Sequence, residues 1–176
     1  MLGCKPSGRL TEQHDIFFGV GTSLKSLIPQ FHEFWPEAKG DIHIDAWREV
    51  TCVENYAISI VPRSQEVNGD LNLYFINLGG YKKGEFDEYH YKVLAIADSV
   101  AQAGKQSKST AFYKHYNFKG ATSHIDDKYG IDVDDTFKVE DVLPSKFKSS
   151  YQIDIVENSR SEDDELHIGY LKLSKI

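Results

Sequence analysis

Large apolar residues occupy every second position from Leu71 to Phe75. Because successive side chains of a strand point to opposite faces, this spacing predicts a partly buried β-strand over residues 71–78. The apolar runs at residues 91–97 and 16–20 predict two further strands. The glycine-containing segment at residues 79–88 lies between two of these strands and predicts a loop.

Two helices are predicted where good N-cap residues precede a helical stretch. Thr22-Ser23 and Asp98-Ser99 provide side-chain oxygens that accept hydrogen bonds from the unpaired backbone N–H groups of a helix start. The first helix is predicted over residues 23–34, and the second runs from residue 99 to about residue 106. Pro29 must kink the first helix or begin a second piece, since proline lacks an N–H and clashes with the preceding turn.

Several motifs occur twice, at offsets that increase along the chain. The pattern Leu-Gly-x4-Gly-x3-Glu-x-His begins at Leu2 and again at Leu78, an offset of 76 (78 minus 2). His-Ile-Asp begins at His43 and again at His124, an offset of 81 (124 minus 43). Two strand patterns recur at an offset of 95 (151 minus 56): residues 56–61 match residues 151–156, and residues 71–78 match residues 166–173. Growing offsets indicate a duplication followed by insertions in the second copy.

We therefore predict an α+β fold of two internally repeated units, residues 1–78 and 79–176, linked by the strand 71–78 and fused in one compact domain. Strands joined by roughly ten residues prefer antiparallel pairing, and one helix per unit then covers one face of its sheet. An approximate two-fold axis would relate the two units.

The first unit lacks the strand that leads into the second one, because only Met1 precedes Leu2. Either the natural chain starts upstream, or the C-terminal strand at residues 166–173 takes the missing place. In the second case we expect that strand to pair with residues 16–20.

Composition excludes several classes of protein. The chain has 176 residues, 40% of them hydrophobic and 12% aromatic, which argues against disorder. A formal net charge of −7 argues against nucleic-acid binding. Two cysteines, Cys4 and Cys52, cannot form a disulfide framework, which fits a reducing compartment. No segment has the length of a membrane span or the pattern of a signal peptide, so we expect a cytoplasmic protein with no membrane partner. Pairing of exposed sheet edges would make it a homodimer.

The candidate chemistry lies in polar residues that occur in both copies. Glu-x-His and His-x-Asp each place two potential ligands on one face of a strand. Such sets suit a divalent metal held by nitrogen and oxygen, or a general acid and base. The sequence favours a structural duty instead, such as holding a glycine-rich loop closed, because a duplication copies that duty too. The candidate residues are Glu12, His14, His43 and Asp45 in the first copy and Glu88, His90, His124 and Asp126 in the second.

Other motifs give no site. The Gly-x4-Gly loops are not phosphate-binding P-loops, because Arg9 and Glu85 stand where lysine is required. Their glycines are interpreted as turn residues. The alternative is a looser anion site formed by backbone N–H groups with Lys5 and Arg9, or with Lys82 and Lys83. The acidic segment at residues 126–135 lacks the spacing of a calcium-binding EF-hand and is interpreted as a solvated loop and strand edge. The acidic run at residues 162–165 is interpreted as a solvated hairpin tip. We find no cofactor-binding motif.

Three segments resemble a known family. Leu2-Gly3-Cys4, the stretch Thr-Glu-Gln-His-Asp-Ile-Phe-Phe-Gly at residues 11–19 and His-Ile-Asp-Ala-Trp at residues 43–47 are similar to the bacterial family catalogued as domain of unknown function 1543. The resemblance covers residues 1–61 well and the second copy more loosely. It departs from the family at Cys4, where glycine is usual, and in the strand expected before the Leu-Gly opening. It implies a bacterial protein and supplies no activity.

Two classes of function follow. The sequence favours a non-catalytic binding or assembly module, with exposed aromatic residues such as Trp35, Trp47, Tyr113 and Tyr116 at the interface. The alternative is a metal-dependent or acid–base hydrolase that uses the repeated Glu-x-His and His-Ile-Asp groups. A hydrolase requires these polar side chains to converge within a few ångströms, whereas a module requires an exposed apolar patch.

Overall fold

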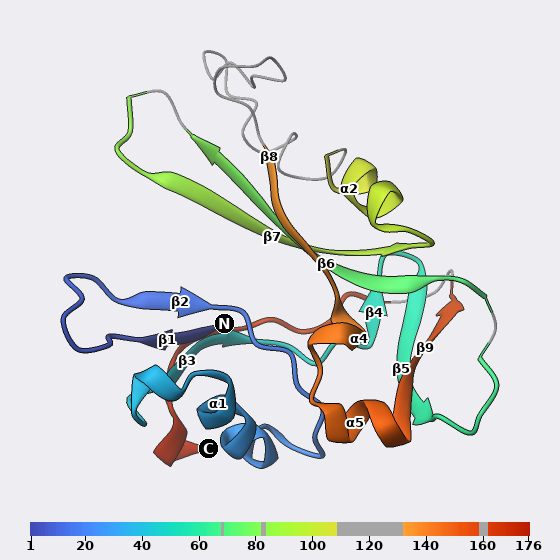
Figure 1. The fold of residues 1–176 in the computed structure, drawn as a ribbon, viewed down its shortest axis with the longest axis horizontal. Helices are drawn as coiled ribbons and strands as arrows, with labels where there is room; N and C mark the ends of the chain where they lie inside the picture. The colour runs from blue at the N-terminus through green and yellow to red at the C-terminus, as the bar shows by residue number, and fades with distance from the viewer. Residues whose placement is uncertain (68, 82–83, 109–131, 159–161) are drawn as a thin grey trace.

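The chain adopts an α+β fold with antiparallel sheets, as predicted (Figure 1). The computed structural model describes residues 1–67, 69–81, 84–108, 132–158 and 162–176. Three sheets are formed, which we call sheets A, B and C, and short helices pack beside them. In the described part of the chain, no helix is both long and apolar enough to cross a membrane.

Sheet A contains four strands in the order β10-β3-β1-β2, so its two outer strands come from opposite ends of the chain. Its strands are β1 (Leu2–Cys4), β2 (Gln13–Asp15), β3 (His43–Trp47) and β10 (His167–Lys172). The helical segments beside it are η1 (Leu24–Leu27), α1 (Ile28–Phe34), η2 (Pro36–Ala38) and η3 (Leu173–Lys175).

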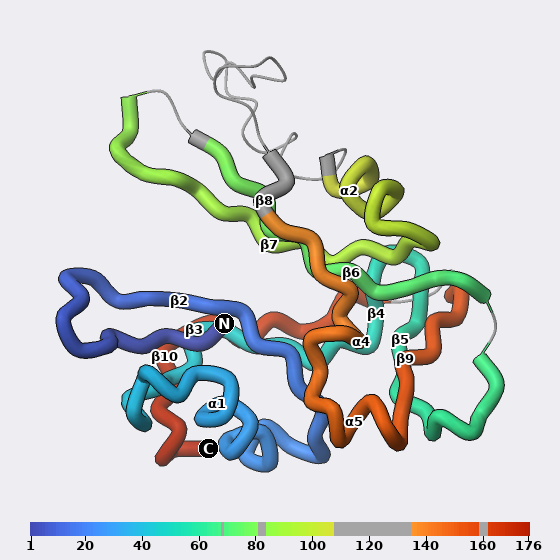
Figure 2. The backbone as a smooth tube through the Cα atoms, viewed as in Figure 1, coloured from blue at the N-terminus to red at the C-terminus, as the bar shows by residue number. Residues whose placement is uncertain are grey.

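One face of sheet A packs on α1. Leu2, Cys4 and Ile44 are almost fully buried there against Phe31 of α1. The C-terminal end of the chain lies beside α1 (Figure 2), and Ile176 packs against the same cluster. Because side chains alternate along a strand, Gly3 is left to the opposite face of β1.

Sheets B and C share a second core. Sheet B has the order β4-β5-β9 and sheet C the order β7-β6-β8. Ile58, Leu73, Ile96 and Val139 are buried together between them. The strands are β4 (Cys52–Val53), β5 (Tyr56–Pro62), β6 (Asn72–Tyr81), β7 (Glu88–Ala97), β8 (Asp132–Lys138) and β9 (Tyr151–Glu157). The helices are α2 (Val100–Lys108), α4 (Val139–Val142) and α5 (Ser145–Ser150).

The predicted helix starts are confirmed. Ser23 caps η1 in a reciprocal arrangement with Ser26, and Pro29 lies in the first turn of the separate helix α1. At the second start, the Ser99 hydroxyl accepts a hydrogen bond from the backbone N–H of Gln102. The expectation of one helix per unit is wrong, because the second half carries α2, α4 and α5.

The predicted strand at residues 16–20 is wrong. Strand β2 ends at Asp15, whose carboxylate accepts a hydrogen bond from the N–H of Ile16 at 2.7 Å. Phe17 then packs edge-on against Phe31, and Phe18 packs against Phe75. The apolar run therefore fills two different cores and does not continue the sheet.

Two further expectations fail because of where the C-terminal strands pair. Strand β10 pairs with β3 and not with residues 16–20. Strand β9 pairs with β5, so the acidic run at residues 162–165 is not the tip of a hairpin between β9 and β10. Strand β6 also continues through Gly79 and Gly80, which were expected in a loop.

Candidate functional site

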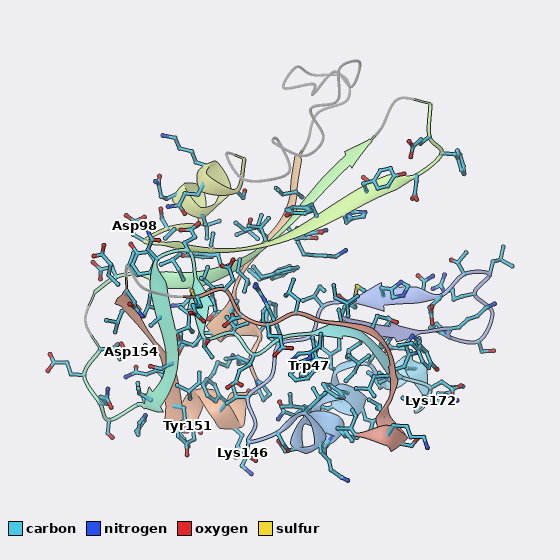
Figure 3. All side chains as sticks on the ribbon, turned by 180° about the vertical axis from the view of Figure 1, so that it is seen from behind. Trp47, Asp98, Lys146, Tyr151, Asp154 and Lys172 are labelled. Carbon is cyan, nitrogen blue, oxygen red and sulfur yellow. The ribbon has the colours of Figure 1, made fainter. Side chains whose placement is uncertain are left out.

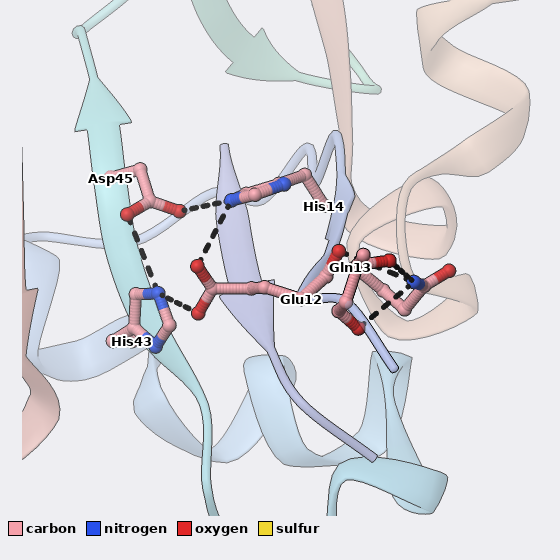
Figure 4. Close-up of polar contacts among 6 residues, drawn as sticks. Glu12, Gln13, His14, His43 and Asp45 are labelled. Atoms are coloured by element: carbon pink, nitrogen blue, oxygen red, sulfur yellow. Dashed lines mark hydrogen bonds and ion pairs between the residues drawn. The ribbon is translucent and has the colours of Figure 1, made fainter. Parts of the chain in front are cut away.

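Four of the predicted site residues meet on the face of sheet A that points away from α1 (Figure 4). Strands β2 and β3 flank β1 on either side, and Gly3 lies opposite both His14 and His43 in the two ladders. We call these four residues the polar cluster: Glu12 just before β2, His14 on β2, and His43 and Asp45 on β3.

Each imidazole of the polar cluster contacts both carboxylates. The Nε2 atom of His43 lies 3.0 Å from Oε1 of Glu12 and 3.3 Å from Oδ1 of Asp45. The Nε2 atom of His14 lies 3.6 Å from Oε2 of Glu12 and 3.4 Å from Oδ2 of Asp45. The four side chains therefore form a closed circuit in which imidazoles and carboxylates alternate.

The polar atoms of this circuit face a shared space. The Nε2 atom of His43 and the Oδ2 atom of Asp45 are buried, and neither makes a hydrogen bond within the described residues. The 3.0 Å contact of His43 with Glu12 thus satisfies the distance of a hydrogen bond but not its direction. Buried polar atoms without a partner are costly, so their presence together calls for a ligand or proton to satisfy them.

Exposure falls steeply across the cluster. The side chains of Glu12 and His14 are 43% and 42% exposed, whereas those of Asp45 and His43 are 20% and 8% exposed. The cluster is therefore open to solvent on the side of β2.

Gly3 makes room for the cluster. A Cβ atom at this position would overlap Nε2 of His43 and would lie 2.5 Å from Oδ2 of Asp45. Sequence reasoning noted Gly3 only as part of the Leu-Gly opening of the repeat. Its pairing with both histidines depends on strand register, which that motif does not specify.

Tyr170 also borders the cluster and was missed from the sequence. Its ring lies on His43, with 4.4 Å between the ring centroids. The repeat pattern aligned Tyr170 with Phe75 as an ordinary strand residue, so only the observed fold brings it to the site.

The second candidate set is described only in part. His90 Nε2 lies 3.7 Å from Oε2 of Glu88, and His90 Nδ1 lies 3.2 Å from the side-chain nitrogen of Asn77. His124 and Asp126 lie outside the described residues. In the backbone register, Gly79 pairs with His90 on one side, as Gly3 does with His14, and with Asp132 on the other.

A cavity of about 770 Å³ lies elsewhere, among residues of all three sheets. None of the polar cluster residues lines it. Its walls are mainly apolar and include Phe17, Phe18, Phe75 and Val93. Its walls also include Leu2, Ile44 and Ala46, so the cavity borders sheet A without including the candidate chemistry.

Two of the four aromatic residues proposed for a binding surface pack against other residues of the protein. Trp35 packs against the core under sheet A, and Trp47 stacks on His167 with 3.9 Å between ring centroids. Figure 3 shows Trp47 between the end of the molecule that carries Lys172 and the end that carries Tyr151. Tyr113 and Tyr116 lie outside the described residues.

Neither the Cys4 thiol nor the Gly-x4-Gly loops provide a reactive group. Burial, with Asp41 and Glu12 nearby, raises the pKa of the Cys4 thiol, so Cys4 stays protonated near neutral pH and is a poor nucleophile. Gly8 and Gly84 have φ angles of +82° and +85°, which confirms their interpretation as turn residues. Among the described residues, no group of three or more His, Cys, Asp or Glu side chains has, as it stands, an arrangement that could hold a metal ion, and this includes the polar cluster.

Comparison with known proteins confirms the family resemblance. The model of the family named Domain of Unknown Function (DUF1543) matches residues 9–60, a segment that contains all four residues of the polar cluster. The crystal structure of protein Il1583 from Idiomarina loihiensis is similar, with a TM-score of 0.65 and 21% sequence identity. The alignment covers 98% of this chain and 93% of that chain, and at this identity it shows the fold alone. No curated protein matches the chain significantly.

Proposed function

We propose that this member of the DUF1543 family is a divalent-metal-dependent hydrolase, with His14, His43 and Asp45 as metal ligands and Glu12 as general base. The observation that carries the proposal is the contact of both imidazole Nε2 atoms with both carboxylates. Two histidines and one carboxylate form a ligand set that catalytic zinc sites use.

The distances support a small ion at the centre of the cluster. Zinc binds nitrogen and oxygen at about 2.0–2.2 Å, so two ligand atoms at a tetrahedral angle are about 3.3 Å apart. Asp45 contacts the two imidazole nitrogens at 3.3 Å and 3.4 Å. Each imidazole nitrogen is thus at the separation from an Asp45 oxygen that two ligands of one ion would have.

The observed side-chain orientation still differs from a formed coordination shell. Asp45 presents Oδ1 to His43 and Oδ2 to His14, so no single oxygen faces both nitrogens. Rotation of this carboxylate about its terminal bond, a torsion with broad preferences, would bring one oxygen toward both nitrogens.

Charge also supports a divalent cation. With both histidines neutral, as metal ligands must be, the two carboxylates give the polar cluster a charge of −2. A divalent ion cancels this charge and satisfies the buried His43 Nε2 and Asp45 Oδ2 atoms. Such an ion would polarise a bound water or a substrate oxygen.

Glu12 suits the role of base better than that of ligand. It precedes β2 and so is the only cluster residue outside a strand, and its side chain is the most exposed of the four. A carboxylate at the solvent side can take a proton from an attacking water while the strand-borne residues hold their positions.

Convergence of the cluster thus supports the hydrolase over the binding module that the sequence favoured. A metal-free acid–base hydrolase is the second candidate. It is favoured by the short distances between imidazoles and carboxylates, because these two kinds of group can act as general acid and base on a substrate without an ion.

The test is metal content and Zn²⁺ affinity of the untagged protein, measured by elemental mass spectrometry and calorimetry. We expect one ion per chain in the wild type and in the control His32→Ala, which changes an exposed histidine on α1. His14→Ala should lose the ion. Glu12→Gln should keep the ion but lose hydrolysis of a panel of chromogenic esters and phosphodiesters.

Absence of Zn²⁺ binding in the wild type would overturn the metal-dependent proposal. If the wild type still hydrolysed a substrate and Glu12→Gln did not, the metal-free alternative would replace it. Equal metal binding by wild type and His14→Ala would place the ion outside the polar cluster.

A further inference from the structure

We infer that Tyr170 is a positioning residue of the same site, held over the His43 imidazole by a β-bulge built into β10. This inference rests on the function proposed for the polar cluster. Its first support is the contact itself: the two ring centroids are 4.4 Å apart and the ring planes are tilted by 40°.

The bulge lies directly opposite a residue of the cluster. In the ladder between β3 and β10, Ile168 pairs with Ala46 and Leu171 pairs with Ile44. One residue of β3, Asp45, therefore faces two residues of β10, and the extra residue bends the strand locally.

The extra residue changes the face to which Tyr170 points. In a regular strand, His167 and Tyr170 would lie on opposite faces, because they are an odd number of positions apart. Here both rings contact residues of β3 that strand alternation places on the cluster face. His167 stacks on Trp47, while Tyr170 covers His43, and these two partners are four positions apart on β3. Without the bulge, Tyr170 would face the α1 side.

Gly169 permits this geometry. Its φ is +136°, a conformation that residues with a side chain rarely adopt. No atom lies within 4 Å of a Cβ built on Gly169, so the requirement for glycine comes from the backbone angle and not from lack of space.

Tyr170 closes the side of His43 that β2 leaves open. His43 is only 8% exposed although it lies on a sheet face, and Tyr170 itself is 63% exposed. A tyrosine so exposed contributes little to the core. Its aromatic ring restricts the rotation of the imidazole and so keeps Nε2 close to the carboxylates of Asp45 and Glu12.

The test compares three variants by Zn²⁺ affinity and by the NMR shifts of the His43 ring protons. Tyr170→Phe keeps the aromatic ring and should match the wild type in both measurements. Tyr170→Ala should bind Zn²⁺ about tenfold more weakly and lose the ring-current shift of His43. Gly169→Ala should resemble Tyr170→Ala without altering any residue of the polar cluster.

Gly69→Ala is the matched control for Gly169→Ala. Gly69 also has a positive φ, +97°, and no atom closer than 4.0 Å to its added Cβ, but it lies in the connection between β5 and β6. It should leave Zn²⁺ affinity and the His43 shifts unchanged.

The outcomes separate this inference from the proposed function. If the wild type binds Zn²⁺ and Tyr170→Ala binds equally well with unchanged His43 shifts, the positioning role is overturned while the metal site stands. If the wild type binds no Zn²⁺, the metal proposal fails, and the His43 shifts alone decide whether Tyr170 orients the imidazole. A loss of affinity in Tyr170→Phe as well would assign the effect to the hydroxyl and overturn the role of the ring.

Discussion

The backbone of Gly3 lies directly beneath the imidazole of His43, and the space above its Cα is filled by that side chain and by Asp45. A methyl group at this position would overlap Nε2 of His43. We predict that Gly3→Ala displaces both side chains and abolishes Zn²⁺ binding, although the variant changes no ligand. Zn²⁺ titration followed by calorimetry would check this, and unchanged affinity would contradict the observed packing.

Gly104 in α2 is a matched control with the opposite expectation. No atom lies within 4 Å of a Cβ built on it, and it lies inside a helix. Gly104→Ala should therefore raise the free energy of unfolding by about 0.5–1 kcal/mol, since glycine costs more backbone entropy than alanine in a helix. Urea denaturation would measure the change, and metal affinity should stay as in the wild type.

Asp164, in the segment before β10, is hydrogen-bonded to Thr51, the residue before β4. Its carboxylate accepts hydrogen bonds from the backbone N–H of Thr51 at 3.0 Å and from the Thr51 hydroxyl at 2.6 Å. We predict that Asp164→Ala lowers the free energy of unfolding by roughly 1 kcal/mol, a value reduced for partial exposure. Asp163→Ala, at the exposed neighbouring position, should change it by less than about 0.5 kcal/mol. Equal effects in urea denaturation would contradict this role.

Stability should fall at alkaline pH because of buried acids. Burial, with Asp41 and Glu12 nearby, raises the pKa of the Cys4 thiol, and burial also raises the pKa of Tyr74. For each group the pKa is higher in the folded state than in the unfolded state. Its contribution to the free energy of unfolding is therefore fully present below the unfolded-state pKa. It is lost as pH rises from there through the folded pKa.

For Cys4 this loss begins above about pH 8.5, and for Tyr74 above about pH 10. Urea denaturation at pH 7.5 and at higher pH would show the decline. Cys4→Ala should reduce the decline in the lower window and Tyr74→Phe should reduce it in the upper one. An undiminished pH dependence in both variants would assign it to other groups.

The sequence singled out the four polar residues that converge in the first copy, but it did not predict what surrounds them. Alternation along β3 places His43 and Asp45 on one face, which is a local property, whereas Glu12 precedes β2 and reaches the cluster from outside a strand. That β2 and β3 flank the same central strand depends on tertiary pairing. The place of Tyr170 beside His43 could not be predicted from the sequence. A single extra residue in β10 reverses the face to which the following side chains point, and strand alternation alone does not reveal it.

The failed strand at residues 16–20 has a related cause. A short apolar run does not distinguish a buried strand from a segment that serves two cores. Phe17 and Phe18 belong to separate clusters, so their burial is satisfied without a ladder of backbone hydrogen bonds. Similarly, the distant partner of β10 could not be read from its own sequence, since β3 precedes it by more than a hundred residues.

The two histidines of the cluster should differ in what they contribute to stability. His14 is 42% exposed, so His14→Ala should lose Zn²⁺ binding while changing the free energy of unfolding by less than about 0.5 kcal/mol. His43 is 8% exposed and packs under Tyr170, so His43→Ala should lose Zn²⁺ binding and also about 1–3 kcal/mol of stability.

Urea denaturation without metal, combined with Zn²⁺ titration, would separate the two effects. A loss of several kcal/mol in His14→Ala would mean that the exposed imidazole holds the fold together, and the cluster would then be structural. Retained stability with lost binding would instead assign His14 to ligand binding. Removal of this partly solvated imidazole leaves strands β1 and β2 paired through their backbones, so the fold does not require it.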